Sequence, residues 1–162
     1  MPIQIHYATP ETLGVDRIAA VCGAFALFPE KNCLVIDTGS CITYDVLDKR
    51  GTYWGGGISP GLEMRLKAMH TFTARLPLVK VNQQANLIGN STESCLQSGA
   101  LYGVLAEIEG IVEKYNQKYD ELKVIMCGGD ASLFENQLKP TIFAAPDLVL
   151  KGLNRILLQN AY

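Results

Sequence analysis

Several residue types and patterns that mark common protein classes are scarce or absent in this sequence. It contains only two histidines, His6 and His70, and no cysteines spaced as CxxC, which argues against a zinc site. No cluster of lysine and arginine is present and the net charge is −2, so we expect no direct binding to nucleic acid. No apolar run approaches the roughly 18 residues that a membrane-spanning helix needs, so we expect no membrane insertion.

The cysteines are scattered and odd in number. There are five, at positions 22, 33, 41, 95 and 127, and most of them stand in apolar surroundings. Residues 1–11 lack the basic segment and the apolar core of a signal peptide. We therefore expect a cytoplasmic protein whose cysteines are buried and reduced.

The sequence does contain enough apolar residues for a sizeable core. Its 162 residues are 48% hydrophobic and 19% charged, a balance typical of an ordered domain. There is no internal repeat, linker or low-complexity segment. We expect residues 1–162 to form one domain.

Hydrophobic periodicity predicts helices and strands in mixed order. The predicted helices run through residues 14–28, 59–76, 90–119, 131–138 and the end of 141–161. The predicted strands cover residues 33–37, 42–47, 52–58, 123–129 and the start of 141–161. We expect the first three strands to be consecutive and antiparallel, because tight turns separate them. This order predicts an α/β fold with a mixed sheet.

Two turns at strand ends combine glycine with polar residues: "DTGS" at 37–40 and "CGGDA" at 127–131. Glycine has no Cβ, so the backbone of such turns can approach an anion closely, and a carboxylate can hold Mg²⁺, a monovalent cation or a bridging water. Two such strand ends in one sheet suggest a nucleotide between them. The alternative is a purely structural role, because Asp, Gly and Ser favour tight turns for local reasons.

These turns belong to a series of motifs that covers nearly the whole chain in order. The series is "YATPETLGVDR", "DTGSCITYDV", "GGGISPGLEM", "TARLP", "GNSTESCLQSG", "CGGDA" and "PDLVLKGLNRI". With GxDR followed by DxG(T/S)xxTxD and GGxIxPG, the chain resembles the type III pantothenate kinases. The resemblance implies an actin-like (ribonuclease H-like) domain, one half of a two-domain kinase. It also implies transfer of phosphate from ATP to the 4′-hydroxyl of pantothenate, the first committed step toward coenzyme A.

The resemblance assigns roles on the pantothenate side of the site. Asp16 resembles the general base that faces the substrate hydroxyl, and Arg17 resembles the residue that binds the substrate carboxylate. Tyr7 and Gly14 match the tyrosine and glycine of the pantothenate pocket, and Thr92 matches a threonine that contacts pantothenate across a subunit boundary. The chemistry suits these residues, because a primary alcohol needs a proton acceptor and a planar guanidinium binds both oxygens of a carboxylate.

Other positions match the nucleotide side of the family's site. Asp37 resembles the acid associated with an activating monovalent cation, K⁺ or NH₄⁺. Gly39 and Ser40 match a phosphate turn in which the family usually has threonine in place of the serine. Gly128 and Gly129 match the turn on the adenosine side. The cofactors implied are ATP, Mg²⁺ and the monovalent cation.

Each residue also has a simpler structural interpretation. Asp16 suits the first turn of a helix because a negative charge there complements the helix dipole. Arg17 could pair with Asp16 or with Glu11 at the surface. Tyr7 could be a core aromatic with a solvated hydroxyl, and Thr92 could act only as a helix cap.

One motif of the family has no counterpart in the sequence. The kinases that the chain resembles begin with on the order of 100 additional residues, which carry an Asp-x-Gly-Asn-Thr turn for the ATP phosphates and Mg²⁺. We expect this chain to correspond to the C-terminal half of the kinase. We also expect it to be inactive or nearly so alone, because positioning supplies much of a kinase's rate.

The resemblance further implies a homodimer that binds pantothenate and ATP. We expect its interface to include the long helix that begins near Thr92, with Leu101, Leu105 and Ile108 shared between the interface and the core. Two alternatives stand beside the pantothenate kinase. One is a non-catalytic regulatory or binding protein of the same fold, because related chains have been labelled transcriptional activators. The other is an actin-like sugar or acetate kinase, which the GxDR and DxG pairing disfavours.

Overall fold

The sheet of the protein joins segments from the whole length of the chain. The computed structural model describes residues 1–134 and 136–160. Six strands form one sheet in the order β1-β4-β3-β2-β5-β6. The strands are β1 (Gln4–Ile5), β2 (Cys33–Thr38), β3 (Cys41–Leu47), β4 (Thr52–Pro60), β5 (Lys123–Cys127) and β6 (Ile142–Ala144). The helices are η1 (Pro10–Thr12), α1 (Val15–Leu27), α2 (Leu62–Thr71), α3 (Thr92–Lys118), α4 (Ala131–Phe134) and α5 (Leu148–Asn160). The α/β fold with a mixed sheet is confirmed.

Strands β2, β3 and β4 are consecutive and antiparallel, as the sequence predicts. In the turn between β3 and β4 the N–H of Gly51 donates to the carbonyl of Asp48 at 2.9 Å. Gly51 has a φ of 81°, which glycine adopts without the strain that a Cβ would bring. β5 is parallel to β2, and β6 is parallel to β5. The two-residue β1, too short to show alternation, pairs in parallel with β4.

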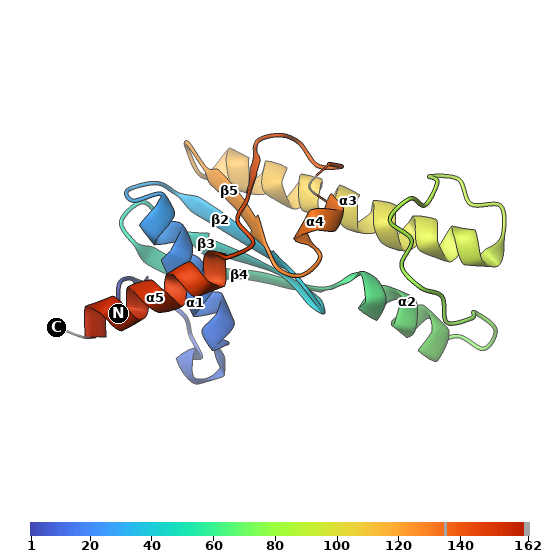
Figure 1. Cartoon of the computed structure of the whole chain (residues 1–162), viewed down its shortest axis with the longest axis horizontal. Coiled ribbons are helices and arrows are strands. Elements are labelled where there is room, and N and C mark those ends of the chain that lie inside the picture. The colour runs from blue at the N-terminus through green and yellow to red at the C-terminus, as the bar shows by residue number, and fades with distance from the viewer. Residues whose placement is uncertain (135, 161–162) are drawn as a thin grey trace.

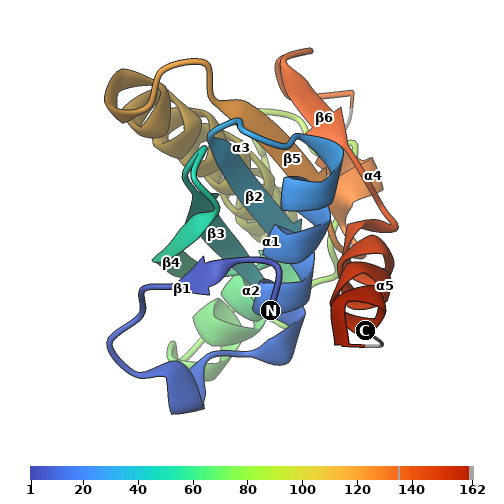
Figure 2. The ribbon, with the colours of Figure 1, turned by 90° about the vertical axis from the view of Figure 1, so that its left-hand side faces the viewer.

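Helices cover both faces of the sheet (Figure 1). In Figure 2, α3 lies on one side of the sheet, and α1 and α5 lie on the other. Neighbouring residues of a strand point to opposite faces, so Leu34 and Ile36 of β2 belong to the core under α3, whereas Cys33 and Val35 belong to the core under α1. This alternation decides which polar side chains of β2 and β3 can meet the N-terminus of α1.

The long helix α3 starts beyond the end of the sheet, beside α2 (Figure 1). Ser91 caps it: its hydroxyl accepts from the N–H of Ser94 at 3.1 Å, and the Ser94 hydroxyl accepts from the N–H of Ser91 at 2.9 Å. Thr92 is therefore the first helical residue and not the cap. Leu101 and Ile108 are buried in the core of this chain, so they are not available for contacts between subunits.

The described part of the chain contains no helix long and apolar enough to cross a membrane. Glu135, in the helix predicted over 131–138, and Ala161, at the end of the last predicted helix, lie outside the described residues.

Candidate active site

Three polar side chains interrupt the apolar face of the sheet under α1. Asp37 lies two residues after Val35 in β2, and Thr43 and Asp45 lie four and two residues before Leu47 in β3; Val35 and Leu47 belong to the core under α1. All three therefore share that face. Asp37 lies directly opposite Thr43 in the antiparallel pair, and Asp45 lies two residues further along β3. The result is a polar strip leading from the end of β2 into the protein.

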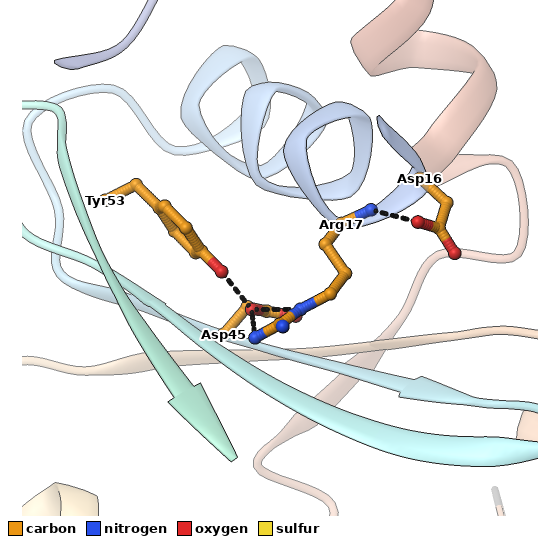
Figure 3. Close-up of polar contacts among 4 residues, drawn as sticks. All are labelled: Asp16, Arg17, Asp45 and Tyr53. Atoms are coloured by element: carbon orange, nitrogen blue, oxygen red, sulfur yellow. Dashed lines mark hydrogen bonds and ion pairs between the residues drawn. The ribbon is translucent and has the colours of Figure 1, made fainter. Parts of the chain in front are cut away.

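Arg17, in the first turn of α1, reaches down to Asp45 on this strip (Figure 3). The Arg17 Nε donates to Oδ1 and Oδ2 of Asp45 at 2.9 and 3.2 Å, and Nη2 donates to Oδ1 at 2.6 Å. The hydroxyl of Tyr53, from β4, donates to the same Oδ1 at 2.7 Å. One carboxylate thus receives hydrogen bonds from a helix and from a neighbouring strand.

The ion pair is enclosed by the protein. Arg17 is only 8% exposed and Asp45 only 1%. Burial by itself lowers the pKa of Arg17, but the hydrogen bonds and negative charge of Asp45 outweigh it, so the pKa is raised above its ordinary value. Arg17 therefore stays charged inside the protein. The surface pairs with Asp16 or Glu11 that the sequence allowed for Arg17 are wrong, because its partner is Asp45.

Tyr7 forms a wall beside this pair. The guanidinium carbon of Arg17 lies 5.9 Å from the centre of the Tyr7 ring, within reach of a cation–π interaction. The rings of Tyr7 and Tyr53 stack with centroids 6.0 Å apart. Gly55 lies under Tyr7 with a φ of 86°, and a Cβ at Gly55 would come within 3.0 Å of the Tyr7 ring. The glycine therefore leaves room for the tyrosine against the sheet.

Asp16 stands beside Arg17 at the N-terminus of α1, but it is exposed, whereas Arg17 is buried. Its Oδ1 accepts from the backbone N–H of Arg17 at 2.9 Å, which fixes the carboxylate at the helix start. A Cβ at Gly14 would overlap this oxygen, so glycine at that position makes room for it. An exposed carboxylate thus lies next to a buried, charged guanidinium.

Asp37 lies at the end of β2, half-buried. Burial, and then the charges of Asp16 and Asp45, raise the pKa of Asp37 above its ordinary value of 3.8. A positive charge bound beside Asp37 would offset this effect and stabilise its ionised form. A Cβ at Gly128 would overlap the Asp37 carboxylate, and Gly128 has a φ of 97°, so glycine is required there on both grounds.

Thr43 carries a polar atom without a partner. Among the described residues, its Oγ1 is the one buried side-chain nitrogen or oxygen that makes no hydrogen bond. Such an atom costs roughly 1–3 kcal/mol relative to a satisfied one. It lies on the same face as Asp37 and opposite to it, so a ligand bound there would find both oxygens. The described residues contain no group of three or more His, Cys, Asp or Glu side chains that could hold a metal ion.

The two glycine turns differ in what they leave open. The N–H of Gly39 donates to the carbonyl of Cys41 at 3.0 Å, so it is not free to bind an anion. The next residue, Ser40, is exposed. A Cβ at Gly129 would meet nothing within 4 Å, which leaves open space beside that turn.

Thr92 lies apart from the other candidates. It is exposed at the start of α3, in a groove that it shares with Cys95 and Leu96. Figure 1 shows the start of α3 far from the start of α1, so one chain does not bring Thr92 to Asp16 and Arg17.

Asp45 and Tyr53 are functional candidates that were not predicted from the sequence. Asp45 is the last residue of the DxG(T/S)xxTxD motif, and a carboxylate in a strand position that alternates with buried apolar residues needs a buried partner. That signal pointed to an ion pair. The identity of the partner depends on how α1 crosses the sheet, which sequence spacing does not specify.

Comparisons with known proteins show what this chain is similar to. The sequence pattern of the family described as type III pantothenate kinase matches residues 1–114. The type III pantothenate kinase of Cytophaga hutchinsonii is 50% identical over 160 residues, covering 99% of this chain and 68% of that protein. The one of Bacteroides fragilis is 51% identical over 160 residues, covering 99% of this chain and 66% of that protein. The chain thus spans about two thirds of the length of these curated relatives.

Solved structures of similar shape support the fold. A Baf family transcriptional activator from Campylobacter jejuni superposes with a TM-score of 0.71 at 25% identity, covering 98% of this chain and 69% of that chain. MreB5 of Spiroplasma citri, bound to ADP, superposes with a TM-score of 0.54 at 11% identity, covering 92% of this chain and 60% of that chain. The latter likeness supports the actin-like fold alone.

Proposed function

The chain belongs to the type III pantothenate kinase family, and we propose that its residues bind pantothenate and position it for phosphorylation by ATP. The observation that carries this proposal is the pairing of an exposed carboxylate, Asp16, with a buried and charged Arg17 in one helical turn. Pantothenate has a hydroxyl that needs a base and a carboxylate that needs a cation. The two neighbouring residues supply one each.

Asp16 is the proposed general base. Its Oδ1 is held by the N–H of Arg17, which leaves Oδ2 to accept a hydrogen bond from the substrate hydroxyl. Orienting the alcohol and accepting its proton is worth roughly 10²–10⁴ in rate. Arg17 and Tyr7 bind the other end of pantothenate, with Gly14 leaving room at the helix start.

The nucleotide side of the site fits a cation together with phosphate. Asp37 supplies a desolvated carboxylate and Thr43 an unpartnered hydroxyl, a combination that suits a monovalent cation such as K⁺ or NH₄⁺. Ser40 supplies an exposed hydroxyl for a phosphate, and the open space beside Gly129, next to Gly128, suits the adenosine side of ATP. When bound with Mg²⁺, ATP supplies the phosphoryl group and the metal neutralises its charge.

A homodimer would complete the site. Thr92 lies far from Asp16 within one chain, so its proposed contact with pantothenate requires a second copy. The exposed start of α3 is the surface through which that copy would contribute. The cytoplasmic location predicted from the sequence stays a prediction.

Binding and catalysis can be tested separately. We expect the chain to bind pantothenate in isothermal titration calorimetry. We expect little ATP-dependent phosphorylation by the chain alone, and restored turnover in a chimera that adds the part of the Cytophaga hutchinsonii relative that this chain does not cover. Absence of pantothenate binding in both proteins would contradict the proposed function.

A non-catalytic role is the second candidate, because the similar Campylobacter jejuni protein is described as a transcriptional activator. A net charge of −2 without a basic cluster offers little to attract DNA. A filter-binding assay with mixed duplex DNA at low salt separates the two functions. We expect no retention of DNA by the chain.

A further inference from the structure

We propose that Asp45 and Tyr53 are positioning residues for Arg17: they hold its guanidinium so that the Nη1 side faces the carboxylate of the substrate. This inference rests on the proposed function. It adds two residues that touch neither substrate nor nucleotide and that set the choice of a carboxylate-bearing substrate.

The guanidinium of Arg17 uses only one of its two edges to bind Asp45. Asp45 occupies the edge formed by Nε and Nη2, with three hydrogen bonds of 2.6–3.2 Å. Nη1 of Arg17 makes no hydrogen bond to Asp45 or Tyr53 (Figure 3), and it is not among the fully buried unpartnered atoms, so it keeps contact with solvent, while Tyr7 lies close enough to the guanidinium to help stabilise its charge. A guanidinium has five N–H donors in a rigid plane, so fixing one edge also fixes the direction of the other.

Asp45 and Tyr53, which hold the guanidinium, are themselves held rigidly. Asp45 is 1% exposed and Tyr53 is 0% exposed, and the Tyr53 hydroxyl donates to the oxygen that also accepts from Nη2. A carboxylate bonded from a strand and from a helix cannot rotate freely. A substrate at the surface cannot displace it, because it would have to remove a buried charge from its partner.

Asp45 affects the affinity of Arg17 for the substrate carboxylate in two opposite ways. It neutralises part of the charge of Arg17, which by itself weakens attraction for a second carboxylate. It also removes the conformational freedom of a long side chain before substrate arrives, which strengthens binding. The second effect is the larger, because charge-assisted hydrogen bonds depend steeply on geometry.

The test compares two ligands on this chain: pantothenate and its alcohol analogue, in which CH₂OH replaces the carboxylate. We expect calorimetry on the wild type to show a preference of roughly tenfold or more for pantothenate. Asp45→Asn should reduce that ratio roughly tenfold while affinity for the alcohol changes little. Tyr53→Phe, a milder change, should reduce it severalfold. In an Arg17→Lys background, Asp45→Asn should cause no further change.

A matched control separates positioning from general loss of stability. Tyr44 is also buried, and its hydroxyl donates at 2.8 Å to Glu107, on the α3 side of the sheet. Tyr44→Phe should lower the unfolding temperature about as much as Tyr53→Phe and leave the ligand ratio unchanged. If Asp45→Asn does not fold, Tyr53→Phe with this control still decides the question.

A spectroscopic readout follows Arg17 itself. In ¹H–¹⁵N spectra, the Nε–H signal of Arg17, identified by its loss in Arg17→Lys, should exchange slowly with water in the wild type and fast in Asp45→Asn. An unchanged ligand ratio in Asp45→Asn, or tighter pantothenate binding there, overturns the inference and leaves the proposed function intact. Failure of the wild type to bind pantothenate overturns both.

Discussion

Thr43 lies directly opposite Asp37 across the antiparallel pair of β2 and β3, and its buried hydroxyl has no partner among the described residues. A half-buried carboxylate and an orphan hydroxyl on one face are the two groups that we propose bind a monovalent cation. A cation that took oxygens from both would relieve the raised pKa of Asp37 and the unsatisfied hydroxyl together.

Thr43→Val tests the hydroxyl. Valine has the same shape without the oxygen, so we expect the variant without added cation to be as stable as the wild type or up to about 1–3 kcal/mol more stable. We also expect it to lose most of the rise in unfolding temperature that KCl gives the wild type relative to choline chloride, as measured by differential scanning fluorimetry.

The matched control is Thr38→Val. The Thr38 hydroxyl is also buried, but it donates to the carbonyl of Cys127 at 3.0 Å. Removing it should destabilise the chain by about 1–2 kcal/mol and leave the response to K⁺ in place. An equal K⁺ response in wild type and Thr43→Val would remove Thr43 from the cation site.

The raised pKa of Asp37 predicts how the stability of the chain changes with pH. The folded chain binds the Asp37 proton more tightly than the unfolded chain, so its stability falls as pH rises from the unfolded value through the raised folded pKa. Asp37→Asn should therefore be more stable than the wild type at neutral pH, and the difference should shrink as pH falls through the raised folded pKa and vanish below about 4. Urea unfolding at several pH values measures this.

The pKa of Asp48 is shifted in the opposite direction to that of Asp37. Burial would raise the pKa of Asp48, but hydrogen bonds from Trp54 and from the N–H groups of Thr52 and Arg50 outweigh it, so the pKa is lowered. Asp48→Asn should be less stable than the wild type at neutral pH, with the loss shrinking as pH falls through the lowered folded pKa. The same sign for both variants would contradict the assignment.

Helices α1 and α5 pack so closely at Gly152 that a larger residue there should destabilise the chain. A Cβ at Gly152 of α5 would overlap the backbone carbonyl of Ala19 in α1. Gly152→Ala should therefore force the two helices apart and cost about 1–3 kcal/mol in chemical unfolding. Gly110→Ala in α3, where an added Cβ meets nothing within 4 Å, should instead stabilise the chain by up to about 1 kcal/mol.

The strands could be predicted from sequence because alternation is a local property. Leu34 and Ile36 face one core and Val35 the other, and that pattern is readable residue by residue. The same reasoning placed Asp16 and Arg17 at the start of a helix. The pairing of Arg17 with Asp45, 28 residues away, could not be predicted, because it depends on where α1 crosses the sheet.

The sequence also does not reveal which backbone donors of the "DTGS" turn are free. The sequence suggested that glycine in "DTGS" frees its backbone for an anion, yet the N–H of Gly39 is occupied by the carbonyl of Cys41. Composition indicates that a turn is tight but not which of its donors remain free. The orphan hydroxyl of Thr43 was equally invisible, since an atom without a partner is recognised only when its neighbours are placed.

The catalytic prediction concerns Asp16 and Arg17 in the chimera with restored turnover. Asp16→Asn keeps the shape but cannot accept the hydroxyl proton, so we expect kcat to fall by roughly 10²–10⁴ with little change in pantothenate affinity. Arg17→Ala should do the reverse and weaken pantothenate binding first, because the carboxylate loses its cation. Initial rates over a range of pantothenate concentrations separate the two. Glu11→Gln, which removes an exposed carboxylate five residues before Asp16, is the control and should change neither constant. Near wild-type kcat in Asp16→Asn would transfer the role of base to Asp37, a half-buried carboxylate on the α1 side of the sheet, or to water.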